Sequence, residues 1–524
     1  HSLPAERDAF VGRRETLAAL VQRLDAGARL VSVLGIGGTG KTRLATRFGW
    51  SWLGDYPGGV WFCDLSPARS VDGIVFAVAQ GLDVPLGKDD PVTQLGHAIA
   101  GRGRCLLILD NFEQVARCAE ETLGRWLDRA SNAQFLVTTR EVLGLQGEEV
   151  LAVAPLQAAD ALTLFLRRAE AAKPNFQAST EDQSVITRLV ELLDCLPLAI
   201  ELAAARVRVM PPKVLLARMN ERFKLLSSAG GRRDRQATLR AVFDWSWDLL
   251  SLPEKAALAQ LSVFEGGFTL ESVETVLDLS MYEDAPFIMD ALQSLVQKSF
   301  VRQVGDARFD LLVSVKDYAS EHLRTEERYT GSGSAALLSA EARHGEHFAG
   351  LDEKLAIANQ GVELDNFVVA CRRAVTRGVA DVAANALEHA WAVLKSRGPF
   401  SVGVELASVV RDTTGLSAKE IAQVEWVAGR ALASSGKDRD AYSHFEASLV
   451  SARSAGDRRR ECHALIDMAF RDNHAGRVEI ARIHGAAALA MANELSDWNL
   501  ESRTQNVLGN MEEMQGRLNE AEAH

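Results

Sequence analysis

The stretch Gly35-Ile36-Gly37-Gly38-Thr39-Gly40-Lys41-Thr42 fits the phosphate-loop pattern G-x-x-x-x-G-K-[ST]. It follows an apolar run at residues 30–34, which predicts a buried strand, and it precedes a helical pattern that begins at Arg43. The main-chain N–H groups of such a loop surround phosphate oxygens at the positive end of the following helix. The strand–loop–helix context therefore predicts a nucleotide site, and the alternative is a tight turn that binds nothing.

Two side chains near this loop predict a place for a magnesium ion. Lys41 is expected to reach the β- and γ-phosphates of a nucleotide, and the Thr42 hydroxyl is expected to ligate Mg²⁺. The ion also needs a carboxylate at a strand end. Asp110 supplies it, because it closes the apolar run at residues 106–109. We therefore predict Thr42 and Asp110 as the metal ligands.

Catalysis is assigned to Lys41, Asp110, Glu113 and Arg140. A strong hydrolase places an acid directly after the strand-end aspartate to polarise water, but Asn111 stands there and Glu113 is one alternative. Glu113 equally fits an acid that interacts with a helix dipole. Arg140 is expected to point toward the γ-phosphate, and the alternative is a surface salt bridge. Slow hydrolysis is the expectation.

Short apolar runs at residues 30–34, 59–63, 105–109 and 134–138 alternate with helical patterns, which predicts parallel strands in a three-layer α/β domain. Helical patterns follow, and then runs at 300–304 and 308–312 predict the hairpin of a winged helix. The predicted organisation is a multidomain fold with a tag or linker (1–8), a P-loop nucleotide-binding domain (9–152), a helical domain (153–230), a winged-helix domain (231–328), a linker (329–340) and an α-solenoid (341–524).

Small residues recur every 40 positions in the Ala-rich C-terminal part: the turn glycines Gly436, Gly476 and Gly516, the alanines Ala441, Ala481 and Ala521, and the series Gly429, Ala469 and Gly509. In helical hairpins such residues allow close helix approach, and glycine ends a helix. The pattern resembles tetratricopeptide repeats of the longer type, and the alternative is coincidence. The chain ends inside a repeat, so we expect the natural protein to continue. We expect the basic run at residues 458–460 to be a solvated turn.

Composition excludes several classes of protein. The 524 residues are 47% hydrophobic and 24% charged, with a net charge of −12, which excludes a largely disordered chain and a whole-chain grip on nucleic acid. Six cysteines lie far apart without a C-x-x-C pair, as in reduced cytoplasmic proteins. No apolar run approaches the ~18 residues of a membrane helix. We therefore expect a cytoplasmic protein without a membrane segment.

Beyond the phosphate loop, several ordered motifs resemble the STAND class of signal-transduction P-loop ATPases, most closely the bacterial NB-ARC-like proteins of the antibiotic-regulator and maltose-regulator type. The motifs are Phe10-Val11-Gly12-Arg13, Leu109-Asp110-Asn111-Phe112-Glu113, Thr138-Thr139-Arg140, Leu196-Pro197-Leu198-Ala199 and the winged-helix segments at residues 238–246 and 261–269. The resemblance implies that ADP or ATP binds with Mg²⁺. It assigns cofactor binding to Val11, Arg13, Gly35, Gly37, Gly38, Thr39, Gly40, Lys41, Thr42, Arg43 and Pro197, with Pro197 packed on adenine.

The chain departs from this family at two positions. Cys195 replaces a glycine before Leu-Pro, which a helix would tolerate. Leu312 stands where plant and animal relatives carry a histidine that reads the β-phosphate of ADP, so other groups must close the winged helix over ADP. Leu312 itself is expected in the core.

The resulting expectation is a nucleotide-dependent switch. The repeats would receive a protein or a small-molecule inducer, and ATP would permit self-association and control an absent effector that acts on transcription or a kinase. The alternatives are a turnover ATPase that remodels partners, a regulator that binds DNA through the winged helix, and a repeat scaffold. The basic run at residues 232–235 with Arg240 tempts a DNA-binding interpretation, but a solvated interdomain loop is favoured, so we expect no direct nucleic-acid binding.

Overall fold

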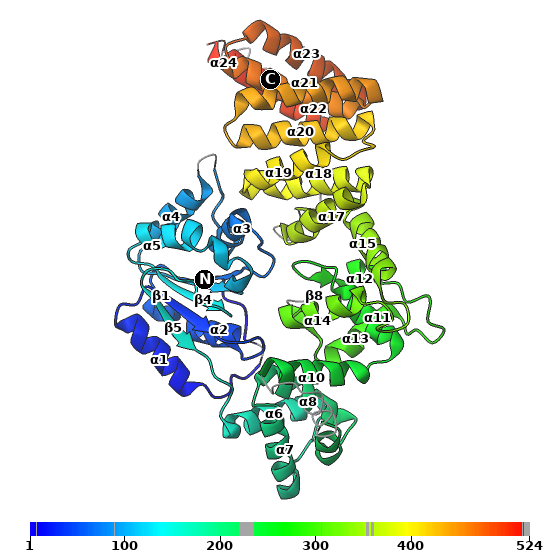
Figure 1. Ribbon diagram of the computed structural model, residues 1–524. Coiled ribbons are helices and arrows are strands. Elements are labelled where there is room, and N and C mark those ends of the chain that lie inside the picture. Colours follow the sequence, from blue (N-terminus) through cyan, green and yellow to red (C-terminus); the bar gives the residue numbers. More distant parts are fainter. Residues whose placement is uncertain are drawn as a thin grey trace. The chain divides into compact units, whose positions relative to one another are not determined.

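A computed structural model describes residues 1–6, 8–87, 90–219, 235–304, 307–352, 356–357, 361–515 and 517 (Figure 1). The chain divides into two compact units. The N-terminal unit comprises residues 1–84 and 92–344, and the C-terminal unit comprises residues 85–91 and 345–524. Within the described residues, no helix is both long and apolar enough to span a membrane.

A five-stranded sheet forms the centre of the region that contains the phosphate-loop sequence. Its neighbouring strands all run parallel, in the order β2-β3-β4-β1-β5. The strands are β1 (Leu30–Leu34), β2 (Val60–Asp64), β3 (Leu106–Asp110), β4 (Gln134–Thr139) and β5 (Glu148–Ala152). The first four were predicted. The sequence did not predict β5, because this edge strand begins with two glutamates, gives no continuous apolar run, and has only Leu151 buried.

Helices surround this sheet and bury its apolar residues (Figure 1). Leu20 and Leu24 of the first helix and Leu44 and Phe48 of the second join one buried core with residues of β1, β3, β4 and β5. The helices of this part are α1 (Arg14–Asp25), α2 (Lys41–Ser51), η1 (Leu53–Asp55), α3 (Val71–Leu82), α4 (Pro91–Gly101), η2 (Phe112–Gln114), η3 (Ala116–Cys118), η4 (Glu120–Gly124) and α5 (Arg125–Arg129). The carboxyl ends of the parallel strands are left to build a site.

A helical segment follows, formed by α6 (Ala158–Ala172), α7 (Thr180–Leu192), α8 (Pro197–Ala204) and η5 (Ala205–Arg208). Ser179 and Asp182 form a capping box at the start of α7. Pro197 occupies the first turn of α8, where its missing N–H costs nothing. These local signals explain where the two helices begin.

The next elements include a three-stranded antiparallel sheet of order β6-β8-β7. The predicted hairpin is present as β7 and β8. The elements are α10 (Arg235–Asp248), α11 (Leu252–Leu261), β6 (Phe268–Thr269), α12 (Leu270–Val276), α13 (Ile288–Gln297), β7 (Val301–Val304), β8 (Arg308–Leu311), α14 (Val313–Arg324) and α15 (Ser334–Ala349). Helix α15 begins inside the segment expected as a linker. The basic run at residues 232–234 lies outside the described residues, whereas Arg240 pairs with Glu321 at 2.6 Å.

The secondary structure described in residues 345–524 of the C-terminal unit is entirely helical. Its helices are α17 (Leu364–Arg377), α18 (Ala380–Arg397), α19 (Phe400–Arg411), α20 (Ala418–Ser434), α21 (Asp438–Ala455), α22 (Arg458–His474), α23 (Val478–Leu495) and α24 (Trp498–Met514). Gly436 and Gly476, with φ of 77° and 74°, form the turns of successive hairpins. The third turn glycine, Gly516, lies outside the described residues. The helical hairpins therefore follow the 40-residue period of the sequence.

Candidate nucleotide-binding site

The phosphate loop joins the end of β1 to the start of α2. Gly38 and Gly40 adopt φ of 78° and 89°, a left-handed conformation that strains any residue with a Cβ. Thr39 Oγ1 donates to the Ile36 carbonyl at 2.9 Å and closes the loop on itself. Gly38 and Gly40 are thus required by the backbone geometry, and the N-terminal N–H groups of α2 lie at the end of this loop.

Lys41 lies at the first position of α2, and its ammonium is drawn back into the loop. Nζ donates to the carbonyls of Gly35 and Ile36 at 2.7 and 3.2 Å. Burial lowers the pKa of Lys41, and nearby Glu113 opposes this change. A buried ammonium among main-chain groups of a phosphate loop is suited to pairing with phosphate oxygens.

Asp110 lies at the centre of a polar cluster at the ends of three strands. Thr42 Oγ1 donates to Oδ1 and Oδ2 of Asp110 at 2.8 and 3.0 Å, and Thr138 Oγ1 donates to Oδ1 at 2.5 Å. Asn111 Nδ2 bridges Asp110 Oδ2, at 3.0 Å, and Asp64 Oδ1, at 3.1 Å. Burial, followed by the charge of Asp64, raises the pKa of Asp110 to about 7. The structure thus brings the two residues predicted as metal ligands together.

The sequence did not identify Asp64 and Thr138 as part of this cluster. Both come at or near the end of a predicted strand, and parallel strands end at the same edge of a sheet. The first polar residue after each apolar run was therefore the available signal. A paired carboxylate and hydroxyl with a second carboxylate nearby form a donor set that fits Mg²⁺.

Glu113 and Arg140 form an ion pair beside the phosphate loop. Arg140 Nε lies 2.9 Å from Glu113 Oε1. Arg140 Nη2 lies 3.7 Å from the position that a Cβ on Gly37 would occupy. Glu113 Oε2 is buried and has no hydrogen-bond partner among the described residues. The pair therefore lies beside the phosphate loop. Within the described part of the chain, Glu113 keeps one unpaired carboxylate oxygen, and its charge acts on the Lys41 ammonium.

Arg13 ties the start of α1 to the phosphate loop. Its Nη2 donates to the Thr39 carbonyl at 2.8 Å, and its Nη1 donates to the carbonyl of Ala154. Gly12 and Arg13 both have positive φ. A Cβ on Gly12 would lie 2.3 Å from Asp160 Oδ2, so only glycine fits this turn. Val11 precedes the turn and is half-buried.

The N-terminus of α8 meets the phosphate loop directly. The N–H of Leu198 donates to the Gly38 carbonyl at 3.2 Å, and Pro197 Cγ lies 3.9 Å from the position of a Cβ on Gly40. Arg43 was predicted to bind the nucleotide; its guanidinium pairs with the Glu201 carboxylate of α8 at 2.9 Å. Two segments separated by more than 150 residues are thereby joined at the loop.

Cys195 precedes α8 in a left-handed conformation, with φ of 52°. The expectation that Cys195 lies in a helix was wrong. Glycine suits this position because it has no Cβ to strain the left-handed backbone.

The winged-helix region also approaches the loop. The Cβ of Ser314, near the start of α14, lies 3.9 Å from the position of a Cβ on Gly37. Glu265 pairs with Lys316 of α14 at 2.6 Å and with Arg69, which follows β2, at 4.0 Å. Leu312 is half-buried and caps α14 without a side-chain hydrogen bond. Leu239 of α10 comes closer than Ser314, because its Cδ2 lies 3.4 Å from the position of a Cβ on Gly38.

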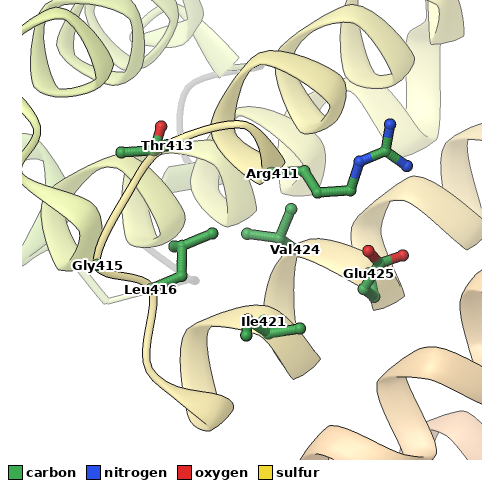
Figure 2. A pocket seen from close by; sticks show the side chains of 7 residues that line it. All are labelled: Arg411, Thr413, Gly415, Leu416, Ile421, Val424 and Glu425. Atoms are coloured by element: carbon green, nitrogen blue, oxygen red, sulfur yellow. The ribbon is translucent and has the colours of Figure 1, made fainter.

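The C-terminal unit contains a separate pocket of about 280 Å³ between the end of α19 and α20. Figure 2 shows its lining residues, Arg411, Thr413, Gly415, Leu416, Ile421, Val424 and Glu425. Glu425 Oε2 already lies 2.5 Å from His444 Nδ1. The residues that the sequence predicts for catalysis, nucleotide binding and metal binding all lie in the N-terminal unit.

The sequence of this chain is similar to those of several known proteins. Residues 250–324 match the family described as a winged helix-turn-helix domain. The chain is 31% identical over 396 residues to "Putative HTH-type transcriptional regulator Rv0890c" of Mycobacterium tuberculosis (strain ATCC 25618 / H37Rv), which covers 74% of this chain and 42% of that relative. It is 26% identical over 350 residues to the regulatory protein AfsR of Streptomyces coelicolor, covering 62% of this chain and 33% of AfsR.

Among solved structures, one similar chain is the STAND protein with a tetratricopeptide repeat sensor PH0952 from Pyrococcus horikoshii. The alignment covers 99% of this chain and 82% of that protein, with 16% identity and a TM-score of 0.48. The uncharacterized protein Rv0894 of Mycobacterium tuberculosis (strain ATCC 25618 / H37Rv) is 32% identical over 371 residues, which is 69% of this chain and 91% of Rv0894. At that identity and coverage, the chain belongs to the family of Rv0894, and it carries a winged helix-turn-helix domain at residues 250–324.

Proposed function

We propose that the protein is a nucleotide-dependent switch of the STAND type, which binds ADP or ATP with Mg²⁺ and regulates an effector. The observation that carries the proposal is the meeting of three distant segments at one phosphate loop. Leu198 of α8 bonds to Gly38, Ser314 of α14 lies beside Gly37, and Arg140 follows β4 next to them. A ligand that fills this loop would act on all three contacts together.

The residues divide into phosphate, metal and base contacts. Lys41 and the main-chain N–H groups of residues 35–40 would hold the phosphates. Thr42 and Asp110, supported by Asp64, would hold Mg²⁺, and the ion would relieve the repulsion between the two carboxylates. Pro197 and Val11 would flank the base. Arg13 and Arg43 would hold α1 and α8 against the loop through the contacts described above.

Hydrolysis is proposed to be slow. Asn111, which stands where a water-polarising acid would be expected, is engaged with Asp64 and Asp110. Glu113 has one unused buried oxygen, which suits it to orient water, but its other oxygen is paired with Arg140. The turnover-ATPase alternative requires Glu113 to act without restraint from this pair.

The winged helix would close over ADP without the histidine found in other STAND families. Ser314 supplies a hydroxyl beside Gly37, and the Glu265 pairs with Arg69 and Lys316 connect the two regions. Exchange to ATP would release these contacts and permit self-association. The helical hairpins, which we propose to be tetratricopeptide-like, would receive the inducer. The regulator names of two relatives support a transcriptional output.

The test is nucleotide binding by Lys41→Ala. Replacing a buried ammonium that pairs with phosphates should weaken ADP and ATP at least tenfold. The control is Lys173→Ala, which removes an exposed ammonium from the end of α6. Unchanged affinity in Lys41→Ala would refute the site. Acid extraction of the purified protein adds a second readout, since co-purified ADP favours a locked switch over a motor.

A second candidate function is DNA binding through the winged helix, which the family match at residues 250–324 and the regulator names support. Charge opposes it, because this segment contains six Lys and Arg residues against twelve Asp and Glu. Helix α13, the second helix of the helix-turn-helix, carries Asp290 as its one charge, and Lys298 after it pairs with Glu254. Salt-sensitive binding of duplex DNA by the full chain would support this candidate, and no binding at low salt would exclude it.

A further inference from the structure

Three polar residues occupy the same position in successive helical hairpins of the C-terminal unit. Gln423 on α20, His463 on α22 and Arg503 on α24 are separated by the 40-residue period. They therefore lie at the same position of the first helix of each hairpin. Arg503 Nη1 donates to His463 Nδ1 at 2.9 Å, so neighbouring hairpins touch through this series.

Two more guanidinium groups converge on the same place. The Cζ of Arg460 lies 4.6 Å from the ring centroid of Trp426, and the Cζ of Arg430 lies 5.9 Å from it. The ring of His463 lies 5.2 Å from the Trp426 ring, between centroids. We call Arg430, Arg460, Arg503 and His463 the arginine cage.

Residues 458–460 were expected to form a solvated turn, but all three begin helix α22. Arg458 and Arg459 are solvated as expected, with side chains 50% and 66% exposed, whereas the side chain of Arg460 is only 12% exposed. It crosses to α18 and donates to both carboxylate oxygens of Glu388 at 2.8 Å. The sequence could not show this, because the partner residue is 72 positions away.

The cage has more donors than acceptors. Arg430 pairs with Asp467 at 2.7 Å and Arg460 with Glu388. Arg503 has no carboxylate partner within the part of the chain that the structure describes. The Nη1 of Arg460 and the Nε of Arg430 are buried and make no hydrogen bond there. Buried donors without acceptors are rare in folded proteins, and a ligand is one way to satisfy them.

The charges around His463 give independent support. Its pKa lies well below the ordinary value, first because of burial and then because of Arg503, Arg460, Arg459 and Arg430. The imidazole is therefore neutral at pH 7. Since its Nδ1 accepts from Arg503, its proton resides on Nε2 and can be donated to a further acceptor.

We propose that the arginine cage binds the phosphate group of a phosphorylated small molecule. Three guanidinium groups and one imidazole N–H offer more donors than a single carboxylate accepts, whereas a phosphate monoester presents three terminal oxygens. Binding at the cage is inferred from the repeat helices alone. Its use as the signal received by the hairpins rests on the proposed function.

The test uses the full chain and inorganic phosphate as the probe, measured by calorimetry at low salt. Arg503→Gln removes the guanidinium that lacks a carboxylate partner and should weaken phosphate binding about tenfold or more. The matched control is Arg372→Gln on α17, which loses the same charge from an exposed pair with Glu405 of α19. Phosphate binding unchanged in Arg503→Gln, or lost equally in the control, would overturn the proposal.

Two further variants separate this site from the phosphate loop. Lys41→Ala should retain phosphate binding at the cage; if that variant loses all of it and Arg503→Gln loses none, the probe binds only at the loop and the cage proposal fails. Conversely, Arg503→Gln should keep the nucleotide affinity of the wild type. Arg503→Lys, which keeps the charge but not the planar fork, should bind phosphate with intermediate affinity. Equal thermal unfolding of these variants would show that they fold.

Discussion

Arg140 Nε lies 2.9 Å from Glu113 Oε1, and the pair stands beside Gly37 of the phosphate loop. The sequence left four roles open: a water-orienting acid or a helix-dipole acid for Glu113, and a γ-phosphate contact or a surface salt bridge for Arg140. In the structure the two residues are partners. The arginine that could reach a γ-phosphate therefore also restrains the carboxylate that could orient water.

This relationship predicts the behaviour of Glu113→Gln. The amide cannot act as a base, so ATP hydrolysis should fall about 100-fold or more, while ATP affinity should change little because Lys41 and the loop are intact. Steady-state phosphate release and equilibrium nucleotide binding measure the two effects. Glu121→Gln, at an exposed position of η4, is the control. An unchanged rate would remove Glu113 from the proposed mechanism.

Glu265 connects the winged-helix region to the segment after β2, and its removal should loosen the closed arrangement. Glu265→Gln weakens the pairs with Lys316, at 2.6 Å, and Arg69, at 4.0 Å. ADP should dissociate several-fold faster, because each pair contributes up to about 1 kcal/mol at a partly exposed site. Stopped-flow release of a fluorescent ADP measures the rate. Glu271→Gln on α12 is an exposed control, and equal rates in both variants would contradict a closing role for Glu265.

Gly429 allows α20 and α21 to approach closely. A Cβ at Gly429 would lie 2.6 Å from Cε1 of the buried Phe445 ring. Gly429→Ala should therefore lower the free energy of unfolding by about 1–3 kcal/mol, despite the better helix propensity of alanine. In Gly485→Ala the new Cβ would meet the flexible end of Leu508, also at 2.6 Å, so its cost should be smaller. Denaturant unfolding of both variants checks this order, and the reverse order would refute the argument.

The lowered pKa of His463 predicts that the protein loses stability in acid. Its pKa is lowered in the folded state, by burial and by guanidinium groups from α20, α22 and α24, with Asp467 the nearby acid on α22. The unfolded chain therefore binds this proton more tightly, so stability present above about pH 6.5 is lost as the pH falls toward the lowered value.

The slope is at most about 1.4 kcal/mol per pH unit. His463→Gln should flatten it between pH 7 and 5, whereas His474→Gln at an exposed position should not. Denaturant titrations at both pH values measure the difference. A wild-type slope in His463→Gln would show that other groups cause the acid sensitivity.

The sequence by itself determined the local features of this protein. The phosphate loop, the strand that ends at Asp110 and the turns at Gly436 and Gly476 follow from glycine conformations, apolar runs and a fixed period. Each needs only residues close together in the chain, so a pattern is enough to predict it. The edge strand β5 was missed because it carries no continuous apolar run and its burial depends on its neighbours.

Only the tertiary structure decided which distant groups meet. The approach of Ser314 to Gly37, the Asp64–Asn111–Asp110 cluster and the crossing of Arg460 to Glu388 join residues that no local pattern links. The left-handed conformation of Cys195 belongs to the same group, because packing of α8 against the loop fixes the backbone there. Local preferences are encoded in neighbouring residues, whereas charge pairing and close packing between segments exist only after the chain has folded.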